Sequence, residues 1–492
     1  MKIISVSSFF QRASKPKQQQ LGLQSGMKTT IQPPGLARLT HWPERRLPPF
    51  VRRSPVAMKY LALFRPLDWT NLPWRDTTRP HPGPAAASPI PYIAAFLIKL
   101  DQQQRTMGQL RQYLVEHPAL TWLLGFPLQM CLDAAYGFDV AASLPSPARF
   151  SFLLRTLPNQ MLQFLLTDTV SLLKRTLPSD LPFGQMVSLD TKHIIAWVKE
   201  NNPKAYVKEG RTDKTRQPKG DKDCKYGCKR RSNQSGPQTP TKEGQPVAGL
   251  GVGKDEFYWG YASGVVATKL PGWGEFVLAE MTQTFDKGDI LTFLPLMEMV
   301  AQRLGFAPPF GTADAAYDSF YTHEYFHKAG GFAAIPYVDK TKGRFFHFDE
   351  AGLPLCDAGL AMPVKSTFIN RSSAVVHQRA RHACPLLFPE RTALSCPVNH
   401  KKWAEGGCVS TLPTSVGTRI RYQIDRQSDD YKALYSQRTA VERIFSQAVA
   451  LGMERPKLRN QCAITNQNTL TYVLINLRAW KRVLAIKQQR PS

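Results

Sequence analysis

Three acidic residues lie far apart in the chain, each in a context that could bring it to a shared site. Asp190 follows the short apolar run 186–189, and Asp314 follows the run 310–313. Glu442 lies within a stretch of helical periodicity. Each acid alone is typical of a turn, a helix cap or a solvated helix face. Together they form a set of hard oxygen ligands, which two-metal phosphodiester cleavage requires. We predict that Asp190, Asp314 and Glu442 are catalytic and bind two Mg²⁺ or Mn²⁺ ions.

The residues around Glu442 support a site of this kind. Tyr435 and Arg438 precede Glu442 by seven and four residues, so one continuous helix would present all three on one face. Arg438 would then meet a phosphate while Glu442 binds metal, and Val441, Phe445 and Val449 would form a neighbouring buried stripe. The alternative is an ordinary surface ion pair between Arg438 and Glu442, which contributes only tenths of a kcal/mol.

Three sequence blocks, 187–192, 312–318 and 435–445, resemble the catalytic blocks of bacterial insertion-sequence DDE transposases. They read Val-Ser-Leu-Asp-Thr-Lys, Thr-Ala-Asp-Ala-Ala-Tyr-Asp and Tyr-Ser-Gln-Arg-Thr-Ala-Val-Glu-Arg-Ile-Phe, and the last fits a Tyr-x-x-Arg-x-x-x-Glu signature. The resemblance covers roughly residues 90–490. Part of that family has a lysine seven residues after the glutamate, where this chain has Val449.

The resemblance implies binding to double-stranded DNA, both the inverted ends of a mobile element and its target. It also implies a homodimer on DNA, cleavage that frees a 3′-hydroxyl, and strand transfer. Lys457, Arg455 or Arg459 could supply the charge missing at Val449. The DNA-binding residues that we expect are Tyr435, Arg438, Lys192, Arg443, Lys457 and Arg459.

Composition agrees with a nucleic-acid partner. The 492 residues include 64 Lys and Arg against 37 Asp and Glu, a formal net charge of +27. Such an excess attracts polyanions, because each neutralised phosphate releases condensed counterions. No run of about 18 apolar residues predicts a membrane span. Eight scattered cysteines without a secretory leader predict a reducing, cytoplasmic location rather than a disulfide framework.

The order of the expected strands and helices indicates how the three acids could come together. From residue 181 the pattern reads as three strands (186–189, 257–270 and 275–284), a helix over 289–304, a strand over 310–313, a helix over 319–328 and a strand over 332–338. Helices over 429–451 and 468–487 follow. This α/β order, with a mixed sheet, is that of a ribonuclease-H-like core, in which the first and fourth strands are neighbours. Asp318 is expected to cap the helix that follows it.

The remaining segments suggest further domains. Residues 1–57 have the composition of a basic disordered tail, and 58–180 read as a helical domain for DNA-end binding or dimerisation. The catalytic domain would comprise 181–339 and 430–492, with a flexible basic loop at 199–231. Residues 340–429 predict a β-rich insertion. There Cys356, Cys384, Cys396, His400 and Cys408 suggest structural zinc, but closely spaced cysteine pairs are absent, so buried thiols are the favoured interpretation.

Two alternatives to a transposase remain at this point. A nuclease of the same fold would cut DNA without joining it and without needing terminal repeats. A catalytically silent transposition repressor would bind the element ends without cutting. The presence of all three acids disfavours the repressor, and the helical domain and the insertion disfavour a plain nuclease.

Overall fold

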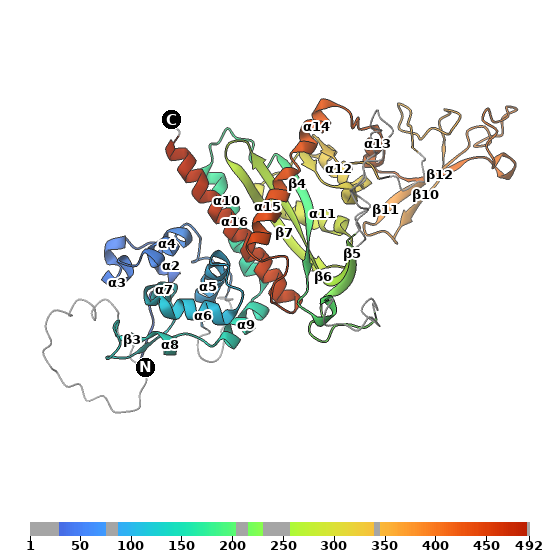
Figure 1. The fold of residues 1–492 in the computed structure, drawn as a ribbon. Coiled ribbons are helices and arrows are strands. Elements are labelled where there is room, and N and C mark those ends of the chain that lie inside the picture. The colour runs from blue at the N-terminus through green and yellow to red at the C-terminus, as the bar shows by residue number, and fades with distance from the viewer. Residues whose placement is uncertain (1–28, 75–86, 203–214, 230–255, 339–344, 490–492) are drawn as a thin grey trace, which may run out of the picture.

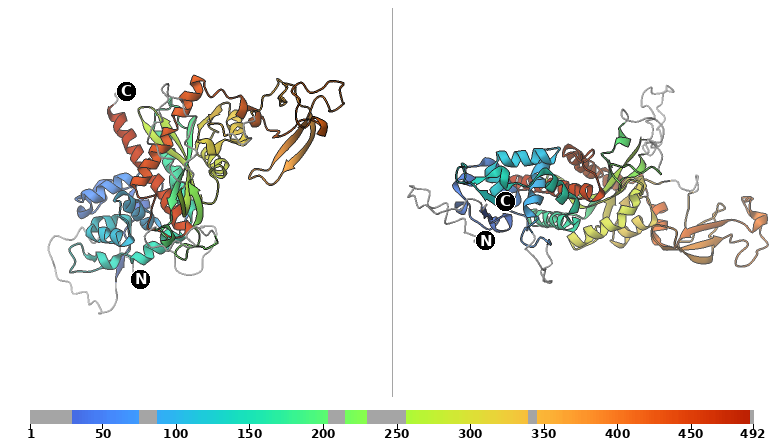
Figure 2. Two further views of the ribbon diagram at one scale, coloured as in Figure 1. Left: turned by 45° about the vertical axis from the view of Figure 1, so that its right-hand side comes forward. Right: turned by 90° about the horizontal axis from the view of Figure 1, so that it is seen from below.

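The computed structural model describes residues 29–74, 87–202, 215–229, 256–338 and 345–489. The chain forms three parts that follow one another across the molecule (Figure 1). A helical domain lies at one end, a sheet flanked by helices lies in the centre, and a small three-stranded sheet projects at the other end. Two further views keep this elongated order (Figure 2).

The helical domain is built from short helices that carry clear boundary signals. Thr106 and Gln109 form a reciprocal capping box at the start of α6, and Gly125 ends α7 in the left-handed conformation that favours glycine. Its main helices are α4 (Pro55–Phe64), α5 (Ile90–Asp101), α6 (Met107–Glu116), α7 (Pro118–Leu124), α9 (Pro147–Thr156) and α10 (Asn159–Thr176). The shorter elements are α2 (Leu36–Leu39), η1 (Glu44–Arg46), α3 (Pro49–Arg52), α8 (Val140–Ser143) and the strands β1 (Thr30–Ile31), β2 (Leu128–Met130) and β3 (Phe138–Asp139).

The prediction of a disordered tail up to residue 57 is wrong for residues 29–57. Leu36, Leu39, Leu47 and Val51 are at most 2% exposed and belong to the core of the helical domain. β1 pairs with β2, so this segment also contributes to a small sheet. Proline and arginine are the most frequent residues of this segment, but these four buried apolar residues are enough to pack it against the helical domain. Residues 1–28 lie outside the described residues.

The central sheet has the strand order β7-β6-β4-β8-β9, with β5 on the same edge of β6 as β7. β4 pairs with β8, and β8 with β9, in parallel, whereas β6 is antiparallel to both β4 and β7. The prediction of an α/β fold with a mixed sheet is therefore confirmed. The strands are β4 (Met186–Ile195), β5 (Lys225–Lys229), β6 (Glu256–Leu270), β7 (Gly274–Thr284), β8 (Phe310–Thr312) and β9 (Phe332–Ala334).

Helices cover both faces of this sheet, so its strands are apolar on both sides. Leu189 and Val266 pack with α11 (Phe293–Leu304), which follows the short helix η4 (Asp289–Thr292). Val265 and Ala267, on the opposite face, pack with α15 (Thr439–Ala450) and α16 (Gln461–Gln489). α12 (Phe320–Lys328) connects β8 to β9.

The insertion forms an antiparallel sheet of β10 (Val364–Asn370), β11 (His377–Ala383) and β12 (Val409–Pro413). The chain then returns to the core through α13 (Val416–Gln423) and α14 (Asp429–Ser436). These three strands lie within 340–429, the segment for which a β-rich insertion is predicted. None of the helices in the described ranges is long and apolar enough to cross a membrane.

Candidate active site

The register of two parallel strands brings Asp190 and Asp314 together. Ser188 on β4 lies opposite Thr312 on β8, and each acid lies two residues further along its strand direction. Because side chains alternate between faces with a period of two, both acids leave the sheet on the face of Ser188 and Thr312. The prediction that the first strand ends at Asp190 is wrong, since β4 continues to Ile195 and pairs with β6 at that position.

The electrostatics of the two carboxylates follow from their burial and from each other's presence. Burial first, and then the negative charge of Asp314, raise the pKa of Asp190 to about 6, whereas Arg438 acts in the opposite direction. Burial also raises the pKa of Asp314. The Asp314 side chain accepts the Ala316 N–H at 2.9 Å, which fixes its orientation at the start of a short 3₁₀ turn. Two buried acids that disfavour each other's charge form a site that favours a cation.

Arg438 supplies the cation in this structure. Its guanidinium lies 3.3 Å from the Asp190 carboxylate and 3.3 Å from the Glu442 carboxylate. α15 is held over β4 by its apolar face and by the Ser188 hydroxyl, which donates to the Gln437 carbonyl at 2.9 Å. Glu442 is one helical turn further along and its side chain is 52% exposed. Arg438 therefore bridges Asp190 on the sheet and Glu442 on the helix.

A fourth acid, Asp289, belongs to the same cluster and was not predicted as a site residue. Burial raises its pKa to about 7, and the next largest causes are the charges of Asp314 and Asp190. Its position at the start of the predicted helix over 289–304 pointed only to a helix boundary. The sequence held no stronger signal, because its approach to the other acids depends on how η4 packs against the sheet edge.

A chain of hydroxyl groups supports the base of this cluster. The Tyr317 hydroxyl lies 2.9 Å from the Thr191 hydroxyl and 3.2 Å from that of Thr292. Tyr317 is fully buried. The three residues come from β4, from the turn after β8 and from η4, which are the segments that carry Asp190, Asp314 and Asp289. The hydroxyl contacts thus fix these segments relative to one another.

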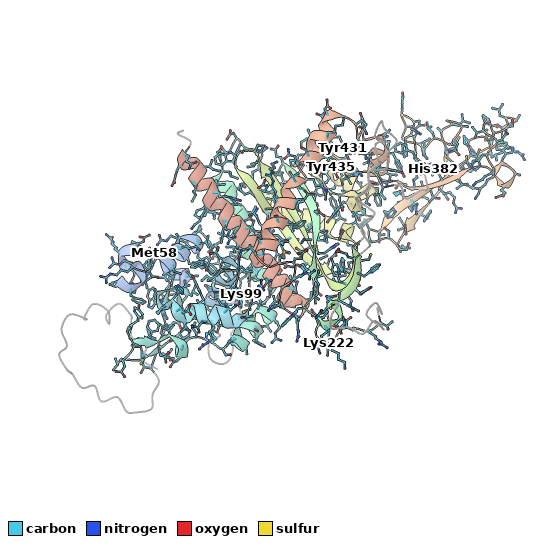
Figure 3. All side chains as sticks on the ribbon, in the orientation of Figure 1. Met58, Lys99, Lys222, His382, Tyr431 and Tyr435 are labelled. Carbon is cyan, nitrogen blue, oxygen red and sulfur yellow. The ribbon has the colours of Figure 1, made fainter. Side chains whose placement is uncertain are left out.

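The helix predicted over 429–451 is interrupted at Gln437–Arg438, so Tyr435 does not share a helix with Glu442. Tyr435 instead lies on α14, where its ring stacks on that of Tyr431 at 6.1 Å (Figure 3). Val449, expected in the buried stripe, is 36% exposed. The arrangement of Tyr435, Arg438 and Glu442 on one continuous helix face is a prediction that the structure corrects.

The other residues expected to bind DNA are spread over a wider surface. Lys192 forms an ion pair with the Glu454 carboxylate at 3.0 Å. Arg443 forms an ion pair with the Glu275 carboxylate at 2.7 Å, away from the acid cluster. The Arg459 guanidinium lies 4.8 Å from the centre of the Trp197 ring. Lys457 is exposed at the loop between α15 and α16. The structure therefore brings only Arg438 of this set into contact with the predicted catalytic acids.

The cysteines of the insertion are free thiols. Cys384 and Cys408 are buried with Met362 and Leu386, and Cys356 packs against them. Burial, together with the neighbouring Cys384 and Cys356, raises the pKa of the Cys408 thiol to about 12. Among the described residues no group of three or more His, Cys, Asp or Glu side chains is arranged to hold a metal ion.

Comparison with known proteins adds no identification, since neither a protein-family model nor a curated protein matches the chain.

Proposed function

We propose that this chain is a DNA transposase that cleaves and joins DNA strands with divalent metal ions. The observation that carries the proposal is the placement of Asp190 on β4 and of Asp314 just after the neighbouring parallel strand β8, with Arg438 joining Asp190 to Glu442. The strand order and directions of the central sheet agree with a ribonuclease-H-like core. The three sequence blocks and the net charge of +27 add independent support.

The acid cluster is chemically suited to Mg²⁺ or Mn²⁺. Its donors are hard carboxylate oxygens, and the pKa values of Asp190 and Asp289 are raised partly by the negative charges of neighbouring acids, which a divalent cation would offset. In this structure Arg438 lies against Asp190 and Glu442, and the described acids are not arranged around a metal ion. With Arg438 displaced, Asp190, Asp314 and Glu442 would hold the ions, with Asp289 beside them. When bound, the ions would activate water and stabilise the leaving oxygen. Arg438, released from the carboxylates, would then bind a DNA phosphate.

The direct test measures strand cleavage and joining. The full chain is incubated with Mg²⁺ and DNA segments that flank its own coding sequence, next to Asp314→Asn. Wild type is expected to cut at a fixed boundary and join the freed 3′ end to target DNA, and Asp314→Asn to lose at least about a thousandfold in rate while still binding. Asp180→Asn, a matched change at an exposed position, should leave the rate unchanged.

The outcomes separate the three candidate functions. Cutting without joining, on DNA that lacks the flanking segments, would identify a nuclease. Specific binding by wild type without any cutting would identify a repressor. Equal cutting by wild type and Asp314→Asn would overturn the catalytic assignment.

A DNA-free measurement tests metal binding alone. A ligand that binds only the folded state raises the melting temperature with its concentration. Mg²⁺ is therefore expected to stabilise wild type and Asp180→Asn but to have a much smaller effect on Asp314→Asn. In EDTA, Asp314→Asn should melt at a higher temperature than wild type, because the substitution removes one of the neighbouring negative charges. An identical Mg²⁺ response in all three proteins would argue against a metal site at these acids.

A further inference from the structure

A cleft of about 480 Å³ lies between the helical domain and the loop that joins α15 to α16. The helical domain contributes Lys99 and the segment 103–105, and the core contributes 449–458 and Gln467. The Gln103 side chain donates to the Ala450 carbonyl at 3.2 Å and so ties the two walls together. Figure 3 labels Lys99 where the helical domain meets the core.

Lys99 is an unusual residue for the wall of a cleft. It is only 7% exposed, and no acidic side chain in the described part of the chain forms an ion pair with it. Burial alone lowers its pKa to about 8. A buried ammonium group without a counter-charge is costly. A lysine that serves only to cover apolar surface would extend its charge into water, whereas Lys99 keeps its charge within the cleft.

The rest of the lining is also cationic. Arg105, Arg455 and Lys457 are exposed around Lys99. The one acid in the lining, Glu454, is bonded by Lys192 from β4 at 3.0 Å, so its charge is already compensated. The cleft therefore presents four basic side chains with no acid in the lining left to neutralise them, a charge arrangement that selects an anion.

The position of the cleft indicates which anion. α15 carries Glu442 near its start and Ala450, in the cleft wall, at its end. Eight residues of helix span about 12 Å, a distance that a DNA strand covers within a few nucleotides. Lys192 lies two residues after Asp190 and reaches Glu454 in the cleft. The acid cluster and the cleft are thus spaced as two points along one DNA strand.

We propose that this cleft binds a backbone phosphate of the DNA strand, within a few nucleotides of the phosphate that enters the acid cluster. The inference rests on the proposed function for the identity of its ligand. In this role Lys99 is a DNA-binding residue contributed by the helical domain, and phosphate contact compensates the charge that folding leaves buried. The same contact connects DNA to both walls of the cleft.

The first test measures binding of the full chain to a labelled 30-base-pair duplex in EDTA, so that catalysis plays no part. Lys99→Met is expected to weaken binding about fivefold to tenfold and to reduce the slope of log K against log salt by about 1. Lys99→Arg should retain most of the affinity. The matched control is Lys481→Met, an exposed position on α16 outside the cleft.

The melting temperature of Lys99→Met distinguishes a binding role from a structural one. Because methionine places no charge in the cleft, the variant is expected to melt at or above the wild-type temperature while binding DNA less well. If Lys99→Met binds DNA as tightly as Lys481→Met, or if its loss of affinity merely follows a loss of folding, the inference is overturned.

A second test locates the phosphate. Single methylphosphonate linkages are placed along the strand next to the cleavage position. A neutral linkage at one position within a few nucleotides of the cleavage site should weaken binding by wild type but have little further effect on Lys99→Met. If wild type cleaves DNA but the neutral linkage weakens wild type and Lys99→Met equally, the inference is overturned and the proposed function stands. If the linkage weakens only wild type but no cleavage occurs, the phosphate site stands and the proposed function is overturned.

Discussion

The central sheet is antiparallel in part and the sheet of the insertion is antiparallel throughout, yet the two are stabilised in different ways. In β6 nearly every side chain after the first two is buried, because helices cover both faces of the sheet. In β10 six of the seven residues are exposed. The described part of the insertion has two small buried apolar clusters, one of Met362, Cys384, Leu386 and Cys408 and one of Phe346, Leu412 and Tyr422. Packing therefore specifies the core, whereas the insertion depends on a few polar anchors where the chain returns.

The strongest of these anchors is a buried ion pair between α13, through which the insertion returns to the core, and the turn after β8 that carries Asp314. Arg421 on α13 contacts Asp318 at 2.6 and 2.9 Å, and Asp318 also accepts the Val338 N–H at 2.8 Å. His323 lies 3.1 Å from the same carboxylate. The prediction that Asp318 caps the following helix is wrong, because α12 begins after Ser319 and Asp318 is used in this pair.

The largest expected effect in this comparison comes from breaking that pair. Arg421→Met leaves the buried Asp318 carboxylate without its arginine counter-charge, and should lower the free energy of unfolding by about 3–5 kcal/mol. Urea denaturation at pH 7 measures the change. Arg371→Met, at an exposed position in the insertion, should cost less than about 0.5 kcal/mol. Equal effects of the two substitutions would show that Arg421 is not an anchor.

A matched pair of isoleucines tests the packing contrast directly. Ile194 on β4 is fully buried, whereas Ile369 on β10 is 47% exposed. Ile194→Ala should destabilise the protein by about 2–5 kcal/mol, because it removes buried methyl groups and leaves a cavity. Ile369→Ala should change the stability by less than about 0.5 kcal/mol. If thermal unfolding showed similar losses, the insertion sheet would have to be covered by some other surface in solution.

A smaller, pH-dependent effect is expected from an acid in the core. Glu280 on β7 is fully buried, accepts hydrogen bonds from Gln163 and Thr469, and burial raises its pKa to about 7. Its contribution to stability is therefore complete below the unfolded pKa near 4.5 and is lost as pH rises through about 7. Glu280→Gln, which cannot ionise, should be more stable than wild type at pH 8.5 by at most about 3 kcal/mol.

The pH dependence itself is the control for this prediction. Urea midpoints at pH 5 should show a much smaller advantage for Glu280→Gln, because wild-type Glu280 is then largely protonated. Glu350→Gln, an exposed acid of the insertion, should show no such trend. If the difference in stability between wild type and Glu280→Gln is constant across this pH range, the pKa of Glu280 does not differ between the folded and unfolded states.

The core was predictable because its signals are local. The strands expected over 257–270 and 275–284 match β6 and β7 to within one residue, since apolar runs meet at the Pro271-Gly272 turn. The last helix was predicted from 468 but begins at Gln461, because Asn466 and Gln467 look like surface residues and are in fact buried. Their burial depends on partners from distant elements, which no local pattern shows.

The candidate site was predictable only in part, for the same reason. Asp190 and Asp314 could be paired from strand order, because neighbouring parallel strands bring their acids to one edge. Asp289 could not, since its approach depends on the packing of η4. The interruption before Arg438 also escaped the sequence, because the helical periodicity continues across it and only the hydrogen bond from Ser188 marks the position.

The length and placement of α16 have a consequence for how the protein is made. Its 29 residues run from the helical domain to the central sheet. Asn466 bonds the carbonyls of Leu154 and Leu157, and Asn476 bonds the backbone of Val277 in β7. Domains usually fold in order as the chain leaves the ribosome. Here the helical domain precedes α16 in the chain, but its core includes residues of α16 and cannot be completed without them. The same holds for the core of the central sheet. Both parts therefore complete folding together, at a late stage of synthesis.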